Sequence, residues 1–205
     1  MIEVVENALQ IAALVICSVI AVYKAVHYNS RTWALAAFFF ISWVMGDIYW
    51  LVCLLFYDTT PQISIVSDLS WYASYMFLYL MLLRTSKPDP GSTKQALPWL
   101  GPLFAAGMAV FFMLKGEILN NLIYGSLMGL LLFSSINRLI NRTTDRNQRF
   151  LPAMILVFCL LEYGLWISSC FWTSDTLTNP YYWFDVLLTV SFLFFLPAIR
   201  KAVSA

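Results

Sequence analysis

The chain has 205 residues, of which 61% are hydrophobic, 17% aromatic and only 11% charged, and its formal net charge is +1. Soluble domains carry about 25% charged residues, so this composition excludes an ordinary soluble globular protein. Apolar runs of roughly 18 residues or more, the length that membrane-spanning helices need, recur along nearly the whole chain. The basic residues are spread over short loops, which gives no indication of nucleic-acid binding.

Polar punctuation divides the apolar runs into seven predicted transmembrane helices within one membrane domain, residues 1–205. We expect the spans at approximately residues 8–27, 33–57, 63–84, 97–114, 118–139, 151–172 and 181–199. The runs are too long for the strands of an outer-membrane barrel, so the predicted fold is all-α, in the lipid bilayer of the cell membrane. The opening MIEVVENALQ lacks the basic region of a signal peptide, and we interpret it as a short exported tail.

The distribution of Lys and Arg predicts the orientation, because positively charged loops stay cytoplasmic. Eleven of the twelve Lys and Arg residues fall on one side of the predicted membrane, and Lys115 falls on the other. The N-terminus is therefore expected outside and the C-terminus in the cytoplasm. The eleven residues are Lys24, Arg31, Arg84, Lys87, Lys94, Arg138, Arg142, Arg146, Arg149, Arg200 and Lys201.

The second and third predicted helices resemble the sixth and seventh when the two pairs are aligned. Asp47 then matches Glu162, and Asp68 matches Asp185. This pattern is typical of a parallel repeat in which three helices, a linking helix and three further helices follow one another. Chance similarity between apolar sequences is the alternative.

Acidic residues inside membrane helices are rare and usually face a bundle interior or a water-filled cavity. At 1.5 Å per residue, Asp47 and Glu162 lie near the middle of their predicted helices, and Asp68 and Asp185 lie near the outer ends. A polar pocket open to the outside is the simplest common explanation. Use of the acids only as interhelical hydrogen-bond partners is the alternative, since a single membrane Asp is tolerated.

The predicted ligand-binding set adds Tyr, Trp and Asn residues that share helix faces with the acids, since their side chains can donate hydrogen bonds in a low dielectric. Burial without a cationic partner favours the neutral form of a carboxyl, so a proton-sensitive site is a further hypothesis. The single His and the dispersed cysteines predict no metal or cofactor site. The set is Asp47, Trp50, Asp68, Tyr72, Tyr75, Asn121, Tyr124, Glu162, Trp166 and Asp185.

Two further patterns concern helix packing and the lipid interface. Gly125 and Gly129 form a GxxxG motif, for which we favour packing within the chain over a dimer face. Aromatic residues near helix ends are typical of the belt at the membrane–water interface. They are Trp33, Trp172, Tyr181, Tyr182 and Trp183.

The stretch from Asp47 to Arg84 resembles the seven- or eight-helix membrane input modules of bacterial diguanylate cyclases and sensor kinases. The resemblance rests on Gly46-Asp47-Ile48-Tyr49-Trp50, on Pro61, and on Ser67-Asp68-Leu69-Ser70-Trp71-Tyr72, and the closing FDVLLTVSFLFFLPAIR is similar to their last helix. It implies a sensor of a small or lipid-like molecule. The sequence ends at Ala205 without an output domain, so the expected signal passes to a separate cytoplasmic partner.

Two other resemblances imply different functions. Ser42-Trp43-Val44-Met45-Gly46-Asp47 is similar to a segment of the lysoplasmalogenase family, which implies an intramembrane lipid hydrolase. Its catalytic acids would be Asp47, Glu162 and Asp185, since aspartates in unlike environments can act as acid and base. The three-one-three topology and orientation also resemble small transporters of the PQ-loop type, with the Pro61-Gln62 dipeptide in an outer loop.

Overall fold

A computed structural model describes residues 2–57, 64–85, 96–141 and 146–204, and every regular element in those ranges is a helix. The prediction of an all-helical fold is thus confirmed for the part of the chain described. The elements are α1 (Ile2–His27), α2 (Arg31–Tyr57), α3 (Ile65–Arg84), the short 3-10 helix η2 (Leu97–Trp99), α4 (Leu100–Met113), α5 (Ile118–Ile140), α6 (Phe150–Phe171) and α7 (Pro180–Val203). The Pro61-Gln62 turn, Lys87, Lys94 and Arg142 lie outside these ranges.

Six of the described helices are long and apolar enough to cross a membrane, namely all except the short η2 and α4. η2 and α4 together form a shorter apolar stretch, Leu97–Met113. At 1.5 Å per residue this stretch is about 25 Å long. The composition and length of the helices therefore indicate a membrane protein.

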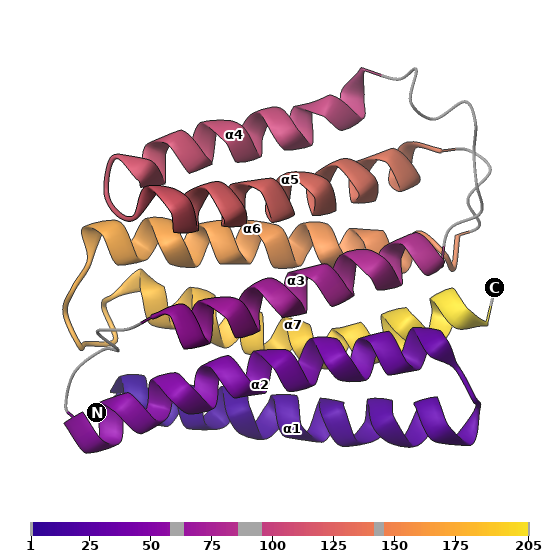
Figure 1. The fold of residues 1–205 in the computed structure, drawn as a ribbon, viewed down its shortest axis with the longest axis horizontal. Coiled ribbons are helices and arrows are strands. Elements are labelled where there is room, and N and C mark those ends of the chain that lie inside the picture. The colour runs from indigo at the N-terminus through magenta and orange to yellow at the C-terminus, as the bar shows by residue number, and fades with distance from the viewer. Residues whose placement is uncertain (1, 58–63, 86–95, 142–145, 205) are drawn as a thin grey trace.

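The six long helices form a closed ring in the order α1, α2, α3, α5, α6 and α7, with α7 in contact with α1. Helix α4 lies outside the ring, against α5 (Figure 1). A parallel repeat of three helices, α1–α3 and α5–α7, joined by α4 would have this order of helices around the ring. The starts of α1, α3, α5 and α7 lie at one end of the bundle, which we call the N-terminal end, and the C-terminus lies at the other (Figure 1).

Helix α1 begins at Ile2, so the expectation of a short tail ahead of the first helix, with the span starting near residue 8, is wrong. Asn7 and Gln10 are buried on the face that continues through Leu14, Cys17 and Ala21. These residues recur every three or four positions, the spacing of one helix face. The polar residues therefore extend the buried stripe of α1 instead of preceding it.

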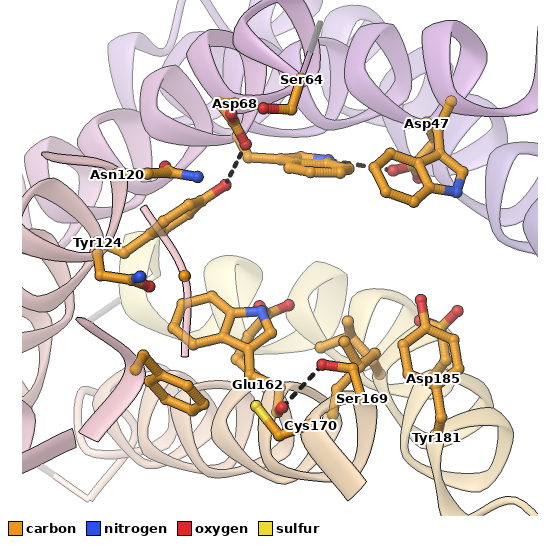
Figure 2. A pocket seen from close by; sticks show the side chains of 18 of the residues that line it. Asp47, Ser64, Asp68, Asn120, Tyr124, Glu162, Ser169, Cys170, Tyr181 and Asp185 are labelled. Atoms are coloured by element: carbon orange, nitrogen blue, oxygen red, sulfur yellow. Dashed lines mark hydrogen bonds between the residues drawn. The ribbon is translucent and has the colours of Figure 1, made fainter. Parts of the chain in front are cut away.

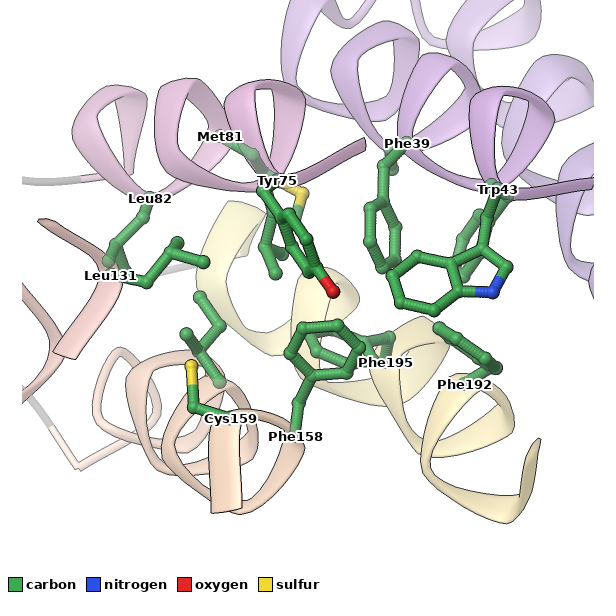
Figure 3. Packing of buried hydrophobic residues seen from close by; sticks show 14 of the residues in the cluster. Phe39, Trp43, Tyr75, Met81, Leu82, Leu131, Phe158, Cys159, Phe192 and Phe195 are labelled. Carbon is green, nitrogen blue, oxygen red and sulfur yellow. The ribbon is translucent and has the colours of Figure 1, made fainter. Parts of the chain in front are cut away.

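Aromatic side chains from α2, α3, α6 and α7 pack together inside the ring (Figure 3). The rings pack mostly edge-on or tilted, with centroids 5.0 Å apart for Trp43 and Phe192 and 5.4 Å apart for Trp43 and Phe158. We call this group the aromatic cluster. Its members are Phe39, Trp43, Tyr75, Phe158, Phe192 and Phe195, all buried.

The GxxxG motif of α5 packs against α4 inside the chain, as predicted. A Cβ added at Gly125 would lie 2.6 Å from the Cβ of Ala109, closer than two carbon atoms can approach. A Cβ at Gly129 would lie 3.6 Å from the Cβ of Ala105, an ordinary contact. Gly125 therefore sets the close approach that holds α4 against the ring.

Candidate ligand-binding site

A cavity of about 450 Å³ lies at the N-terminal end of the ring. All six ring helices and the end of α4 contribute side chains to its lining. Lys115, Gly116 and Ser169 on its wall are exposed, so the cavity reaches the surface between the helix ends. Trp43 and Tyr75 also line it and belong to the aromatic cluster, which forms its floor. The cavity is thus open at the helix ends and closed towards the middle of the bundle.

All four predicted intramembrane acids line this cavity, and each is buried, with 3–7% of its surface exposed. Along their helices, Asp47 and Glu162 lie about 14–15 Å from the N-terminal end of the bundle, and Asp68 and Asp185 about 5–8 Å from it. Figure 2 shows Asp47 and Asp68 on one wall and Glu162 and Asp185 on the opposite wall. The predicted arrangement of two deep acids and two shallower ones is present in the structure.

The two deep acids accept hydrogen bonds from aromatic side chains of α3. The indole Nε1 of Trp71 donates to Asp47 Oδ1 over 3.1 Å. The hydroxyl of Tyr75 donates to Glu162 Oε2 over 2.9 Å. Helix α3 thereby links α2 on one side of the cavity to α6 on the other.

The two shallower acids accept hydrogen bonds from α5 and α1. The hydroxyl of Tyr124 donates to Asp68 Oδ1 over 3.4 Å (Figure 2), and Nε2 of Gln10 donates to Asp185 Oδ1 over 2.7 Å. Gln10 also donates to Oγ1 of Thr189 over 3.1 Å. All four carboxyls therefore connect two helices, so the interhelical role weighed from the sequence is present as well as the cavity.

These hydrogen bonds leave acceptor capacity unused, most clearly at Asp47. Its Oδ2 atom is buried and has no hydrogen-bond partner among the described residues. Within the same residues, no Lys or Arg forms an ion pair with any of the four acids. Lys115 is the one cationic side chain on the described wall, and its Nζ lies 5.8 Å from the ring centroid of Phe171. The lining is therefore strongly acidic, and buried carboxyls without a countercharge are costly.

The Gly46-Asp47 dipeptide explains how Trp71 reaches its acceptor. A Cβ added at Gly46 would lie 2.7 Å from Nε1 of Trp71, so only glycine leaves room for the indole against α2. The next residue, Asp47, then accepts the indole N–H. Gly46 thus leaves space for the indole of Trp71, and Asp47 holds it at the cavity wall by a hydrogen bond.

Nine of the ten predicted ligand-binding residues line the cavity, and the exception is Tyr72. The Tyr72 hydroxyl instead donates to Oδ1 of Asn120, which does line the cavity. Tyr181, predicted to lie in the interface belt, also lines the cavity as the second residue of α7.

The sequence analysis missed two hydrogen-bond donors, Trp71 and Gln10. Trp71 follows Asp68 by three residues and so shares its helix face, a signal that was present in the sequence. Gln10 lies within the first predicted span, but only the packing of α1 against α7 shows that its side chain reaches Asp185. The dispersed cysteines are free thiols, and Cys170 lies on the cavity wall (Figure 2).

No protein-family model, no curated protein and no solved structure matches this chain. The three resemblances noted in the sequence are therefore not tested by these comparisons.

Proposed function

We propose that this protein is a multi-pass sensor of the cell membrane that binds a small molecule from the outside in the cavity of the helix ring. The main observation in support is a cavity lined by all six ring helices. It is open at the helix ends and closed towards the middle of the bundle by the aromatic cluster. Such concave sites with a few convergent polar groups are typical of small-molecule binding. In this proposal α4 is the seventh span, the N-terminus is outside and the C-terminus is cytoplasmic.

Charge asymmetry between the two ends supports this orientation. All eight described Asp and Glu residues lie in the half that contains the cavity, and Lys115 is the only described Lys or Arg there. The other eight described Lys and Arg residues lie at the opposite end. Positive loops remain cytoplasmic, so the cavity would open to the outside.

The aromatic cluster offers a physical connection from the cavity to the rest of the bundle. Trp43 and Tyr75 belong to both, and their ring centroids lie 5.6 Å apart. Because closely packed rings cannot move independently, a ligand on this floor would bias the packing of α2, α3, α6 and α7. The proposed recipient of the signal is a separate cytoplasmic partner at the basic end, in keeping with the resemblance to sensor modules.

Lipid hydrolysis is the second candidate, because Asp47 and Glu162 face one cavity from opposite walls at similar depth. One could act as acid and the other as base on a lipid headgroup in the cavity. Turnover of a lysolipid by purified protein, lost in Asp47→Asn, would select this function. Transport is the third candidate, in which the aromatic cluster on the cavity floor would have to open. Uptake into proteoliposomes would select it.

The proposed outward-open cavity can be tested at Cys170. Trimethylammonioethyl methanethiosulfonate, a membrane-impermeant thiol reagent, is applied to right-side-out and inverted vesicles containing a Cys53→Ala chain. Cys17 and Cys159 are fully buried, so Cys170 is the remaining accessible thiol. We expect modification from the outside only, and none in the matched Cys53→Ala/Cys170→Ala chain. Equal reaction from both sides, or reaction only from the inside, would contradict the proposal.

A further inference from the structure

We propose that the ligand is an organic cation, an ammonium group with apolar substituents, held between carboxylates and aromatic rings. This inference rests on the proposed function, because it assigns a ligand class to the same cavity. Three features of the lining carry it: its charge, its aromatic surfaces and its dimensions.

The four carboxyls of the lining favour a cationic occupant, because a bound cation would stabilise their ionised form. Four carboxyls face the cavity, and Lys115 at the rim is the only Lys or Arg on its described wall. Each carboxyl accepts a hydrogen bond from another helix, yet none has a cationic partner among the residues that the structure describes. Among the same residues, the buried Oδ2 of Asp47 accepts no hydrogen bond. A positively charged ligand would supply the missing countercharge deep in the cavity. Its attraction to a carboxylate is strongest there, because the dielectric constant is lowest.

Aromatic side chains surround the space between the two acidic walls. Ammonium groups bind to the faces of Trp and Tyr rings within about 6 Å of their centroids. Trp166 packs edge-on against Tyr124, and Trp50 is tilted against Trp71, with centroids 4.9 and 5.9 Å apart. Rings at such angles present faces in several directions. The aromatic residues on the wall are Trp43, Trp50, Trp71, Phe112, Tyr75, Tyr124, Trp166 and Tyr181.

The dimensions favour an organic cation over a metal ion. No group of three or more His, Cys, Asp or Glu side chains in the described residues could hold a metal ion. The acids instead stand on opposite walls of a cavity of about 450 Å³. This volume lies within the range of about 300–1,000 Å³ typical of small-molecule sites. A substituted ammonium can fill this space and contact both walls, whereas a bare ion cannot.

The test compares ammonium probes with neutral molecules of the same shape. Purified protein in detergent is titrated with tetramethylammonium, tetraethylammonium and choline, and with 3,3-dimethyl-1-butanol, the uncharged isostere of choline, while tryptophan fluorescence is followed. We expect saturable binding of at least one ammonium probe. For choline we expect binding about tenfold tighter than for its isostere. High sodium chloride should not abolish this preference, because the aromatic contacts are retained.

Asp47→Asn should weaken binding of the ammonium probe by about tenfold or more. Asp185→Asn is the second variant, in case loss of the first carboxyl impairs folding, which circular dichroism would report. Glu117→Gln is the matched control, since Glu117 is an exposed acid at the start of α5 outside the cavity wall, and it should leave affinity unchanged.

The outcomes separate this inference from the proposed function. Equal binding of choline and its isostere, or unchanged affinity in both aspartate variants, would overturn the cationic ligand and leave an outward cavity that reacts at Cys170. Absence of any ammonium binding would also overturn the cationic ligand. Only failure of Cys170 to react from the outside would remove the cavity on which both proposals depend.

Discussion

At the scale of single residues, the cavity wall depends on donors that reach carboxyls from neighbouring helices. Trp71 and Tyr75 come from adjacent turns of α3 and bond to acids on different helices. Each bond joins one wall of the cavity to the other elements of the ring. Small changes in these side chains should therefore alter both stability and the shape of the site.

Gly46→Ala should destabilise the protein by about 1–3 kcal/mol, because the added methyl group would overlap the indole of Trp71 and force it away from Asp47. The measurement is the thermal unfolding midpoint in detergent. Gly107→Ala is the matched control, since nothing lies within 4 Å of its added Cβ. It should be neutral or stabilising by up to about 1 kcal/mol, because alanine favours helices. Equal effects of both substitutions would contradict this account of Gly46.

Tyr75→Phe should cost about 1 kcal/mol, since it removes the donor to buried Glu162 while keeping the ring in the aromatic cluster. Tyr23→Phe provides the control, because the Tyr23 side chain is 63% exposed on α1. A double-mutant cycle with Glu162→Leu, which removes the acceptor, measures the coupling between hydroxyl and carboxyl. Additive effects of Tyr75→Phe and Glu162→Leu would show that the pair contributes no interaction.

At the scale of helices, the two glycines of one motif have different roles. Gly125→Ala should separate α4 from α5 and destabilise the protein by about 1–3 kcal/mol, since its Cβ would overlap Ala109. Gly129→Ala should have little effect, because its Cβ would make an ordinary contact with Ala105. Unfolding in detergent distinguishes the two. A larger loss at Gly129 than at Gly125 would contradict the observed α4–α5 packing.

The ends of the helices could be predicted from the sequence more accurately than which helices pack against one another. The predicted spans end within a few residues of α2, α5 and α6, because apolar run length and polar loops are local signals. The placement of α4 outside the ring depends on which apolar helix faces pack together. The spacing of apolar residues along the chain does not determine this packing. The first turns of α1 were missed because acidic and amide residues there resemble an exposed tail, although they face inward.

In the candidate site, too, the residues that stand out locally in the sequence could be predicted, whereas contacts between distant residues could not. The four acids could be found from the sequence, because a carboxyl in an apolar run is conspicuous wherever its helix packs. Their donors could not all be found, because Gln10 reaches Asp185 across 175 positions of sequence. Tyr72 shares its helix face with Asp68, yet the packing of α5 turns its hydroxyl to Asn120.

At the scale of the whole molecule, the separation of charge predicts how the protein lies in the membrane. An impermeant amine reagent applied to right-side-out vesicles should modify Lys115, the one Lys expected outside. Lys24 and Lys201 should react only in inverted vesicles, since both lie at the opposite end. Mass spectrometry of the labelled peptides makes the comparison. Modification of Lys201 from the outside would reverse the proposed orientation.

The most direct measurement of the central claim is protection of Cys170 by a bound cation. The rate of Cys170 modification from the outside is measured with and without the tightest-binding ammonium probe, in the Cys53→Ala chain and in the same chain carrying Asp47→Asn. The account predicts that the probe slows the reaction and that the uncharged isostere of choline, at the same concentration, does not. In the Asp47→Asn chain, about tenfold more probe should be needed for the same protection. An unchanged rate in the presence of the bound probe would contradict the claim that this acidic, aromatic cavity is the binding site.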